Sequence, residues 1–357
     1  TYSELKNLGV DSVWKQECMV PHWVRRKEAT VEISTNNKDF ISLNATSLGN
    51  SIGTEGAFWD AEVIEVYGLD TLAILGEEII KDKIVFFNRP MDPNQIRTFN
   101  AYGGAVDQRV YGASKAAEFG AVAVLVRSLT TRNDDYPHTG VCVYKENIKK
   151  IPALAISTND ANLLSRLLKQ EKIKVFIRNT SHMLSPKLSY NVIGEIKGST
   201  NPDEIIVIGG HLDAWDVGQG AHDDGSGCVQ SIQVLHTLKT MGYIPKRTIR
   251  VVMFMNEENG LGGGLEYARV SNEKGEYHLA AIVSYRGRFT PRGFTCTAEA
   301  EVFKPFLSKL QELDLFLDPY DLYLKAGGAG ADINPLKSQK GLLIGFKPDN
   351  QRYFDFH

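Results

Sequence analysis

The stretch EIIVIGGHLDAWDVGQGAHDDGSGCVQSIQVLHTLKTMG, residues 204–242, contains a strand, a loop and a helix in succession. Residues 204–210 form an apolar run, which is typical of a buried strand. In residues 225–242 apolar side chains recur at helical spacing, and one stripe is formed by Val229, Ile232, Leu235 and Leu238. The loop between them is rich in glycine, aspartate and histidine. This stretch therefore predicts a strand followed by a polar loop and a helix.

The same alternation continues on the carboxyl-terminal side of this stretch. Further apolar strands are predicted at residues 247–256 and 279–284, and helices at residues 261–270 and 300–313. Strands that alternate with helices indicate an α/β fold with a mixed, mainly parallel sheet sandwiched by helices. In such sheets, ligands bind beyond the carboxyl ends of the strands.

The amino-terminal half has a different pattern, with shorter strands and fewer helices. Its β-type runs lie at residues 61–69, 83–89, 121–128, 151–157 and 172–178. Helical spacing appears at residues 107–120 and 159–170. We therefore expect a compact β-rich domain with a few short helices in this half.

The composition is that of an ordinary globular protein. Of the 357 residues, 43% are hydrophobic and 23% are charged, and the net charge is −3 without a block of like charge. This balance does not favour a nucleic-acid partner or an anionic membrane surface. No apolar run approaches the roughly 18–20 residues that a membrane span needs. The composition thus favours either one large globular domain or two domains of unequal size.

Two further sequence features bear on the cellular compartment. The first residues, TYSELKNLGV, do not form a signal peptide. A signal peptide that preceded them and was cleaved off is compatible with this start. The four cysteines are scattered and form no Cys-x-x-Cys pair, so they indicate neither a zinc knuckle nor a dense disulfide framework. Asn44 and Asn179 begin N-x-Ser/Thr sequons, which matter only in a secreted or lumenal protein.

Acidic and histidine side chains gather where two of the predicted strands end. His211 follows the strand at 204–210, with Asp213 two residues later, and Glu257 and Glu258 follow the strand at 247–256. Each pair alone has an ordinary explanation as a structural histidine or a solvated acidic loop. Adjacent carboxylates that both face a cleft, however, raise each other's pKa unless a cation compensates them.

Asp223 and Asp224 come shortly after His211 and precede the predicted helix. Aspartates stabilise the amino end of a helix, and this role would account for one of the two. Because neighbouring parallel strands end at the same edge of a sheet, His211, the aspartates and the Glu257–Glu258 pair are expected to converge there. Carboxylates with an imidazole suit zinc, and an aspartate can bridge two ions about 3.5–4 Å apart. The combination predicts a metal site.

Two segments in this order and spacing, residues 209–227 and RTIRVVMFMNEENGLGGG at 247–264, resemble the co-catalytic zinc exopeptidases of the aminopeptidase and glutamate carboxypeptidase clan. Shorter segments extend the resemblance over most of the chain: MVPHW (19–23), SIGT (51–54), PHTG (137–140), KIPALAIS (150–157), GADINPL (330–336) and RYFDFH (352–357).

The resemblance implies a fold, an activity and a setting. A zinc exopeptidase domain is expected over residues 1–52 and 186–357, with a β-rich, protease-associated-like domain inserted at residues 53–185. The implied activity is hydrolysis of dipeptides or short peptides with two zinc ions. A homodimer and a secreted, lysosomal or lumenal location are also implied.

The resemblance assigns roles to the residues at the two strand ends. It makes His211 a ligand of one zinc ion, Asp223 the carboxylate that bridges both ions, and Glu258 a ligand of the other. Glu257 becomes the general base that takes a proton from the attacking water. Asp213 becomes the partner that orients His211.

Two positions depart from the family pattern. Tyr285 stands where the family has an aspartate ligand, with Arg286 and Arg288 beside it. A phenol is a poor zinc ligand, and guanidinium groups repel metal ions. The sequence ends at His357, which matches the first histidine of a pair whose second member is the expected ligand. Three explanations are open: a relative that lost catalysis, a chain that is incomplete or was misread, and a weakened site that holds one metal ion.

Three other polar residues are candidates for the substrate cleft. His222, next to Asp223, is more often a pocket-lining residue than a further ligand. By the resemblance, Asp332 and Asn334 lie near the cleft and position a peptide end, and the alternative is a flexible loop ending in a helix cap. The leading hypothesis is a zinc-dependent exopeptidase. The second is an impaired or inactive homologue that binds peptides or proteins or has a structural role.

Overall fold

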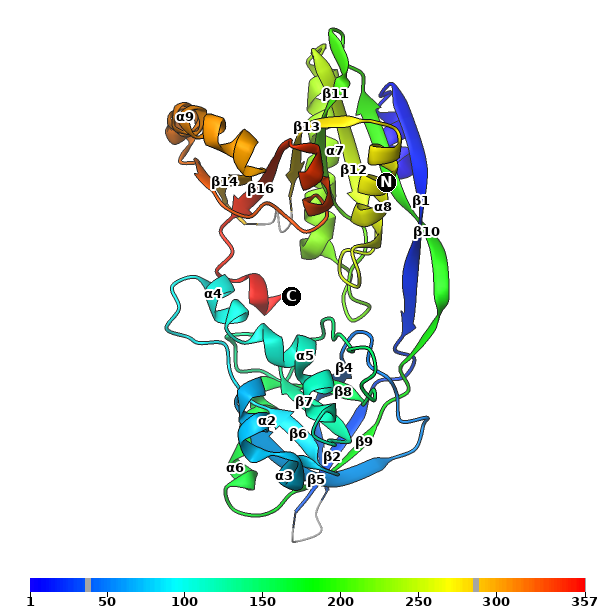
Figure 1. Cartoon of the computed structure of the whole chain (residues 1–357), viewed down its shortest axis with the longest axis vertical. Coiled ribbons are helices and arrows are strands. Elements are labelled where there is room, and N and C mark those ends of the chain that lie inside the picture. The colour runs from blue at the N-terminus through cyan, green and yellow to red at the C-terminus, as the bar shows by residue number, and fades with distance from the viewer. Residues whose placement is uncertain (36–39, 285–288, 357) are drawn as a thin grey trace. The chain divides into compact units, whose positions relative to one another are not determined.

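A computed structural model describes residues 1–35, 40–284 and 289–356 of the chain (Figure 1). The chain divides into two compact units. The described residues form two eight-stranded sheets. The first unit comprises residues 1–20 and 186–350, and the second comprises residues 21–185 and the residues from 351 onward. Both sheets contain parallel and antiparallel pairs, so the fold is α/β, as the sequence predicts.

The first sheet has the strand order β1-β10-β12-β11-β13-β16-β14-β15. Its strands are β1 (Ser12–Val24), β10 (His182–Ile196), β11 (Asn201–His211), β12 (Arg247–Phe254), β13 (Tyr277–Val283), β14 (Pro291–Thr297), β15 (Tyr323–Ala326) and β16 (Leu342–Pro348). The central strands β12, β11, β13 and β16 run parallel, whereas β10 and β14 pair antiparallel with their neighbours β12 and β16. The carboxyl ends of β11, β12 and β13 therefore meet at one edge of the sheet.

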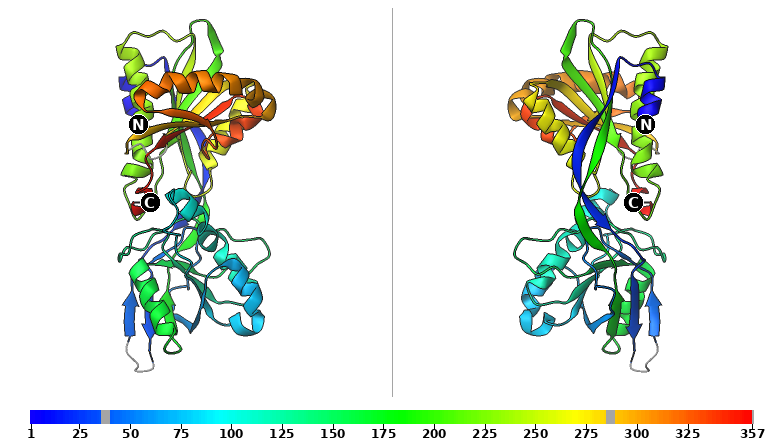
Figure 2. Two further views of the ribbon diagram at one scale, coloured as in Figure 1. Left: turned by 90° about the vertical axis from the view of Figure 1, so that its left-hand side faces the viewer. Right: turned by 90° about the vertical axis from the view of Figure 1, so that its right-hand side faces the viewer.

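Helices cover both faces of this sheet, and α7 and α8 lie on opposite sides of it (Figure 2). Phe254 packs with Tyr267 of α8 on one face, while Met253 packs with Leu5 of α1 and Leu235 of α7 on the other. This alternation follows from the two-residue repeat of a strand. The helices are α1 (Tyr2–Asn7), the turn η1 (Ala221–Gly225), α7 (Ser226–Thr240), α8 (Gly262–Glu273), α9 (Ala300–Leu317), η2 (Asp318–Tyr320) and η3 (Asn334–Gln339).

The elements predicted from the sequence in this unit are confirmed. The apolar runs at 204–210, 247–256 and 279–284 are β11, β12 and β13, and the periodic segments are α7, α8 and α9. The mixed, mainly parallel sheet sandwiched by helices is therefore present. Its strands β1, β10, β14, β15 and β16 were not predicted.

The second sheet has the order β3-β2-β9-β5-β6-β7-β8-β4, in which β5 to β8 run parallel. Its strands are β2 (Thr30–Ser34), β3 (Phe40–Leu43), β4 (Ala45–Ser47), β5 (Trp59–Val66), β6 (Ile84–Phe87), β7 (Ala123–Arg127), β8 (Ala153–Ile156) and β9 (Lys174–Arg178). The short runs predicted between residues 61 and 178 correspond to β5, β6, β7, β8 and β9.

Helices also cover both faces of the second sheet. Phe86 packs on the same face as Leu164 of α6, and Phe87 packs on the opposite face with Ala113 of α5. The helices are α2 (Leu69–Leu75), α3 (Glu77–Ile80), α4 (Thr98–Gly103), α5 (Val106–Ala117), α6 (Thr158–Leu168) and the turn η4 (Tyr353–Asp355). Phe354 of η4 stacks on Tyr102 of α4, with ring centroids 4.5 Å apart. The amino-terminal half is thus an α/β unit with more helices than its strand-rich sequence predicts.

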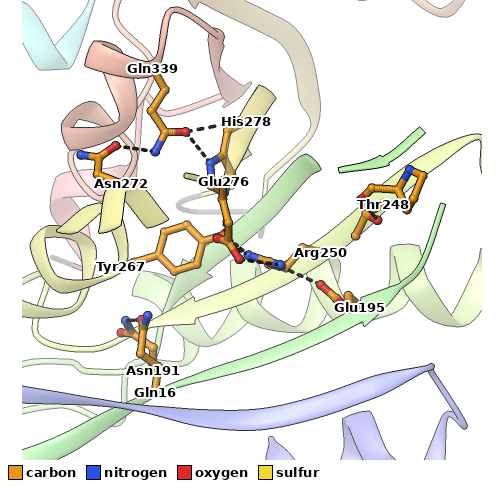
Figure 3. A network of polar contacts seen from close by, with 11 residues as sticks. Gln16, Asn191, Glu195, Thr248, Arg250, Tyr267, Asn272, Glu276, His278 and Gln339 are labelled. Carbon is orange, nitrogen blue, oxygen red and sulfur yellow. Dashed lines mark hydrogen bonds and ion pairs between the residues drawn. The ribbon is translucent and has the colours of Figure 1, made fainter. Parts of the chain in front are cut away.

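A buried polar network fixes β12 to its neighbours in the first unit (Figure 3). The Arg250 guanidinium donates to Glu195 Oε2 at 2.9 Å, to Glu276 Oε2 at 2.9 Å and to the Tyr267 hydroxyl at 3.1 Å. Arg250 is buried, so its charge is compensated by two carboxylates from β10 and from the turn after α8.

The network continues through His278, which is 1% exposed. The main-chain N–H of His278 and its Nδ1 both face Oε1 of Gln339, which accepts from them at 3.2 and 2.7 Å. Nδ1 therefore carries the proton, and Nε2 accepts from the Tyr267 hydroxyl at 2.7 Å. Burial lowers the pKa of His278, in keeping with a neutral ring.

Candidate active site

His211 ends β11 at the carboxyl edge of the first sheet, and its side chain is only 2% exposed. Its Nδ1 donates to the main-chain carbonyl of Asp213 at 2.9 Å, which leaves Nε2 to face Asp223 Oδ1 at 3.0 Å. Burial disfavours a charged imidazole. The hydrogen bond to Asp223 and the charges of Glu257 and Asp224 outweigh it and raise the pKa of His211. Two of the predicted zinc ligands thus lie side by side.

The adjacent Asp223 and Asp224 have different partners. Asp224 is 1% exposed, and its Oδ1 accepts from the Gly227 N–H at 3.1 Å while its Oδ2 accepts from the His211 N–H at 3.0 Å. It therefore caps the first turn of α7 and ties that turn to the end of β11. The helix-stabilising role expected for one of the two aspartates belongs to Asp224, and Asp223 is the one that faces His211.

Asp213 connects the end of β11 with the acidic loop after β12. Its carboxylate accepts from the main-chain N–H groups of Glu257 at 2.9 Å and Glu258 at 3.1 Å. Oδ1 of Asp213 lies 3.8 Å from Nδ1 of His211, whereas its carbonyl is in hydrogen-bond contact with that nitrogen. The main chain of Asp213 thus contacts the imidazole directly, and the carboxylate holds the two glutamates at the same edge.

A residue that the sequence analysis missed, Asn191, holds both ends of this loop. Figure 3 shows Asn191 beside Gln16. Asn191 lies in β10 and is fully buried. Its Oδ1 accepts from the Met255 N–H at 2.9 Å, and its Nδ2 donates to the Gly263 carbonyl and to Gln16 Oε1, each at 2.9 Å. No motif marks this asparagine, because it lies 64 residues before Met255 in the chain.

The loop itself begins at Asn256, which has a left-handed backbone conformation with φ of 67°. Asparagine tolerates this conformation better than most residues with a side chain. Its Oδ1 accepts from the Gly262 N–H at 3.3 Å, across the loop. Asn256 therefore turns the chain sharply after β12, so that Glu257 and Glu258 follow directly at the sheet edge.

Negative charge is concentrated at this edge. Burial raises the pKa of Glu258 to about 8, and the neighbouring charges of Asp223 and Glu257 act in the same direction. His211 opposes that increase. Carboxylates that crowd one another in a buried position are stabilised by a cation.

The donor types at this edge fit zinc. An imidazole Nε2 oriented by a hydrogen bond from Nδ1, together with carboxylate oxygens, is a common zinc ligand set. In the described ranges 1–35, 40–284 and 289–356, no three His, Cys, Asp or Glu side chains are close enough together to hold a metal ion. The pair formed by His211 and Asp223 is therefore the assembled part of the predicted set. Tyr285, Arg286, Arg288 and His357 lie outside the described residues.

The predicted residues of the substrate cleft differ in their exposure. His222 is buried and packs edge-to-face against Phe289, with ring centroids 5.1 Å apart. Asn334 is exposed at the start of η3. Asp332 is completely buried, and the contact of its carboxylate with a peptide end stays a prediction.

The two sequons also differ. Asn44 is exposed, and a glycan there stays a prediction. Asn179 is fully buried, and its Nδ2 donates to Ser51 Oγ at 3.3 Å and to the Ile52 carbonyl at 3.0 Å. This amide nitrogen has two partners inside the folded protein, and a glycan on Asn179 stays a prediction.

Comparison with known proteins gives the chain its class. Residues 191–285 match the sequence profile of peptidase family M28. Carboxypeptidase Q of Bos taurus is 34% identical over 359 residues, which cover 99% of this chain and 72% of that protein. Carboxypeptidase Q of Homo sapiens is 33% identical over 361 residues, which cover 100% of this chain and 72% of that protein.

Solved structures show the same fold. A peptidase M28 precursor from Shewanella amazonensis SB2B superposes with a TM-score of 0.90 at 32% identity, covering 100% of this chain and 79% of the other. A zinc aminopeptidase from Bacillus subtilis has a TM-score of 0.67 at 17% identity, covering 98% and 78%.

The chain belongs to peptidase family M28. Within that metallopeptidase family it is carboxypeptidase Q-like, with about one third of its residues identical over its full length. The resemblance to the zinc exopeptidases predicted from residues 209–227 and 247–264 is therefore confirmed. No helix in the described part of the chain is long and apolar enough to cross a membrane.

Proposed function

We propose that this chain is a zinc-dependent exopeptidase that hydrolyses dipeptides or short peptides. The observation that carries the proposal is the contact between His211 Nε2 and Asp223 Oδ1, at 3.0 Å, at the edge where Glu257 and Glu258 are also held. The relatives named carboxypeptidase Q and zinc aminopeptidase support the same class of reaction.

The residues that would hold zinc are His211, Asp223 and Glu258. When bound, zinc supplies a Lewis acid that polarises a peptide carbonyl and lowers the pKa of water. Nδ1 of His211 is committed to the Asp213 carbonyl, so Nε2 is the nitrogen available as a ligand. Glu258 is deprotonated when it serves as a ligand, and a cation offsets the burial and the like charges that raise its pKa.

Glu257 is the proposed general base. Its carboxylate would take a proton from the attacking water and pass it to the leaving amine. Asp213 positions it, because the Asp213 carboxylate accepts from the Glu257 N–H and fixes the main chain on which the base is carried. Asn191 acts further from the chemistry by fixing the two ends of the same loop.

A second candidate function is a non-catalytic homologue that binds peptides or proteins or has a structural role. The observation that favours it is the sequence Tyr285-Arg286-Gly287-Arg288 at the position where the family has an aspartate ligand. A tyrosine and two arginines there replace negative charge with positive charge, which weakens cation binding.

The setting of the protein is also a proposal. We infer that residues 53–185, together with residues 21–52 of the same compact unit, correspond to an inserted protease-associated-like domain. We also infer that the protein is secreted, lysosomal or lumenal and forms a homodimer. The likeness to carboxypeptidase Q over the full chain supports the first of these inferences. Limited proteolysis and sedimentation velocity would test the domain limits and the dimer.

The deciding experiment is zinc content per chain on protein of verified mass, followed by a dipeptide hydrolysis assay. We expect at least one zinc ion per chain and hydrolysis that a chelator abolishes. The His211→Ala variant should lose zinc and activity. His236→Ala, an exposed histidine on α7, is the matched control and should keep both. Zinc without hydrolysis, or neither, would favour the non-catalytic homologue.

A further inference from the structure

A cavity of about 340 Å³ lies at the carboxyl edge of the parallel strands in the second unit. Tyr67 follows β5, Asn88 follows β6 and Arg127 ends β7, so three neighbouring parallel strands each contribute one polar residue to its wall. Residues of α6 complete the wall. This edge is where parallel sheets bind ligands.

The central group of the cavity is the guanidinium of Arg127, whose side chain is only 9% exposed. Its Nη1 donates to Asn162 Oδ1 at 2.8 Å and to Asn88 Oδ1 at 3.2 Å. Over residues 1–35, 40–284 and 289–356, neither Nε nor Nη2 has an acceptor and no carboxylate pairs with Arg127. A buried charge without a counter-charge is costly, and burial lowers the pKa of Arg127 accordingly.

Two more cations line the same cavity. Arg166 near the end of α6 and Lys169 just after it are both exposed, and neither has an ion-pair partner in the described part of the chain. No aspartate or glutamate lines the cavity. Glu65 does not line the cavity, but its Oε1 accepts from Asn88 Nδ2 at 2.5 Å and from the Tyr67 hydroxyl at 3.1 Å, two residues that do. Three positive charges next to this one carboxylate leave a net positive site, which favours an anionic ligand.

We propose that this cavity binds the phosphate group of a small phosphomonoester. Nε and Nη2 form one edge of the Arg127 guanidinium, and that edge matches two oxygens of a phosphate in a bidentate pair. Arg166 and Lys169 compensate the second charge of the dianion. Tyr67 and Pro90 offer an aromatic and an apolar surface for the organic part of the ligand.

The competing explanation is that Arg127 only ties β6 and β7 to α6 through Asn88 and Asn162. Those bonds use Nη1 alone, so they do not account for the lack of acceptors around Nε and Nη2. Hydrogen bonds to neutral amide oxygens do not require a cation, and they do not explain the two further cations, Arg166 and Lys169. A bound dianion accounts for all three charges.

Isothermal titration of the full chain at low ionic strength tests the proposal, with phenyl phosphate, inorganic phosphate and acetate as probes. We expect saturable one-to-one binding of phenyl phosphate, and weaker binding of acetate because it carries one charge fewer. Tighter binding of phenyl phosphate than of inorganic phosphate would assign an organic phosphate. Equal binding of the two would assign the free ion as the ligand of the same site. No saturable binding of either would overturn the proposal.

Variants identify the site. Arg127→Gln should weaken phenyl phosphate binding by about tenfold or more, because a bidentate charged pair is lost. The exposed double variant Arg166→Ala/Lys169→Ala should weaken it severalfold and is the decisive variant if Arg127→Gln does not fold. Lys172→Ala removes an exposed charge outside the cavity and should bind like the unaltered chain. Unchanged affinity in the double variant would overturn the assignment.

Discussion

The carboxyl edges of the two sheets carry opposite charge. In the first unit, His211, Asp223, Glu257 and Glu258 bring carboxylates together beside one imidazole. In the second unit, Arg127, Arg166 and Lys169 line a cavity without an acidic residue. Both edges have the same topological position after parallel strands, so the fold supplies the place for a ligand and the side chains decide its charge.

The largest expected effect comes from the proposed base at the acidic edge. Glu257→Gln keeps the size of the side chain and its main-chain bond to Asp213 but removes the proton acceptor. We expect kcat to fall by about 10²–10⁴-fold with zinc content retained. Steady-state hydrolysis and metal analysis check this result.

The matched control for that variant is Glu273→Gln, an exposed glutamate at the end of α8. It should change kcat by less than about twofold, as surface substitutions away from a site usually have small effects. Phenyl phosphate affinity at the basic edge should be the same in both variants. A hydrolysis rate in Glu257→Gln equal to that of the control would remove Glu257 from the mechanism.

The next largest effect is expected at Asn191, which holds the loop of the acidic edge but takes no part in the proposed reaction. Asn191→Ala leaves the Met255 N–H and the Gly263 carbonyl without their buried partner. We expect about 1–3 kcal/mol less free energy of unfolding and about 10–100-fold weaker zinc binding. Urea unfolding and zinc titration measure the two effects.

Asn191→Asp sharpens this test. The aspartate still accepts from the Met255 N–H but has no N–H to donate to the Gly263 carbonyl. It also loses the bond to Gln16 and buries a carboxylate against two oxygen acceptors, so the loss is expected to be at least as large as in Asn191→Ala. Unchanged zinc binding in both variants would show that the loop does not need the hydrogen bonds of Asn191. As a control, phenyl phosphate binding in the second unit should be unchanged in both variants.

The smallest effect concerns pH. Folding keeps His278 neutral with a lowered pKa, whereas the unfolded chain takes up a proton near pH 6.5. Stability from this group is therefore present above about pH 6.5 and is lost as pH falls below it. The slope contributed by this one proton is at most about 1.4 kcal/mol per pH unit.

The matched variant is His278→Gln, which removes the titrating group. Its unfolding free energy, followed by urea at several pH values, should fall less steeply than that of the unaltered chain between pH 6.5 and 5. His211, whose pKa is raised, acts in the opposite direction but is present in both proteins and cancels in the difference. Parallel slopes would show that His278 is not the group responsible.

The acidic edge could be predicted from the sequence because its parts are local. His211 and Asp223 flank one loop, and each group of ligands directly follows an apolar strand. The pattern of β11 and β12 is strong because both strands are buried toward their carboxyl ends. That of α7 comes from one stripe, in which Ile232, Leu235 and Leu238 pack on the sheet, whereas Val229 is 66% exposed and does not belong to that stripe. The strands β1, β10, β14 and β15 escaped prediction because most of their residues are exposed or half-buried, which weakens the apolar pattern. The strand β16 was also missed, although it lies inside the sheet between β13 and β14.

The partners that hold the site could not be predicted, because their spacing carries no signal. Asn191 is far in sequence from the loop it clamps, and an isolated asparagine looks like any loop residue. The basic edge was missed for the same reason. Arg127 ends a strand and Arg166 lies on a later helix, and only the folded sheet brings them to one cavity. The buried state of Asn179 and Asp332 likewise comes from tertiary packing alone.

The position of Asp224 has a practical consequence for protein engineering. One carboxylate joins the last residue of β11 to the first turn of α7, so the segment between them is a closed loop whose ends are held independently of its length. Its middle, around Gly218 and Gln219, is exposed. A short epitope tag or fluorophore acceptor inserted there would report on the acidic edge and would leave the two ends of the loop in place.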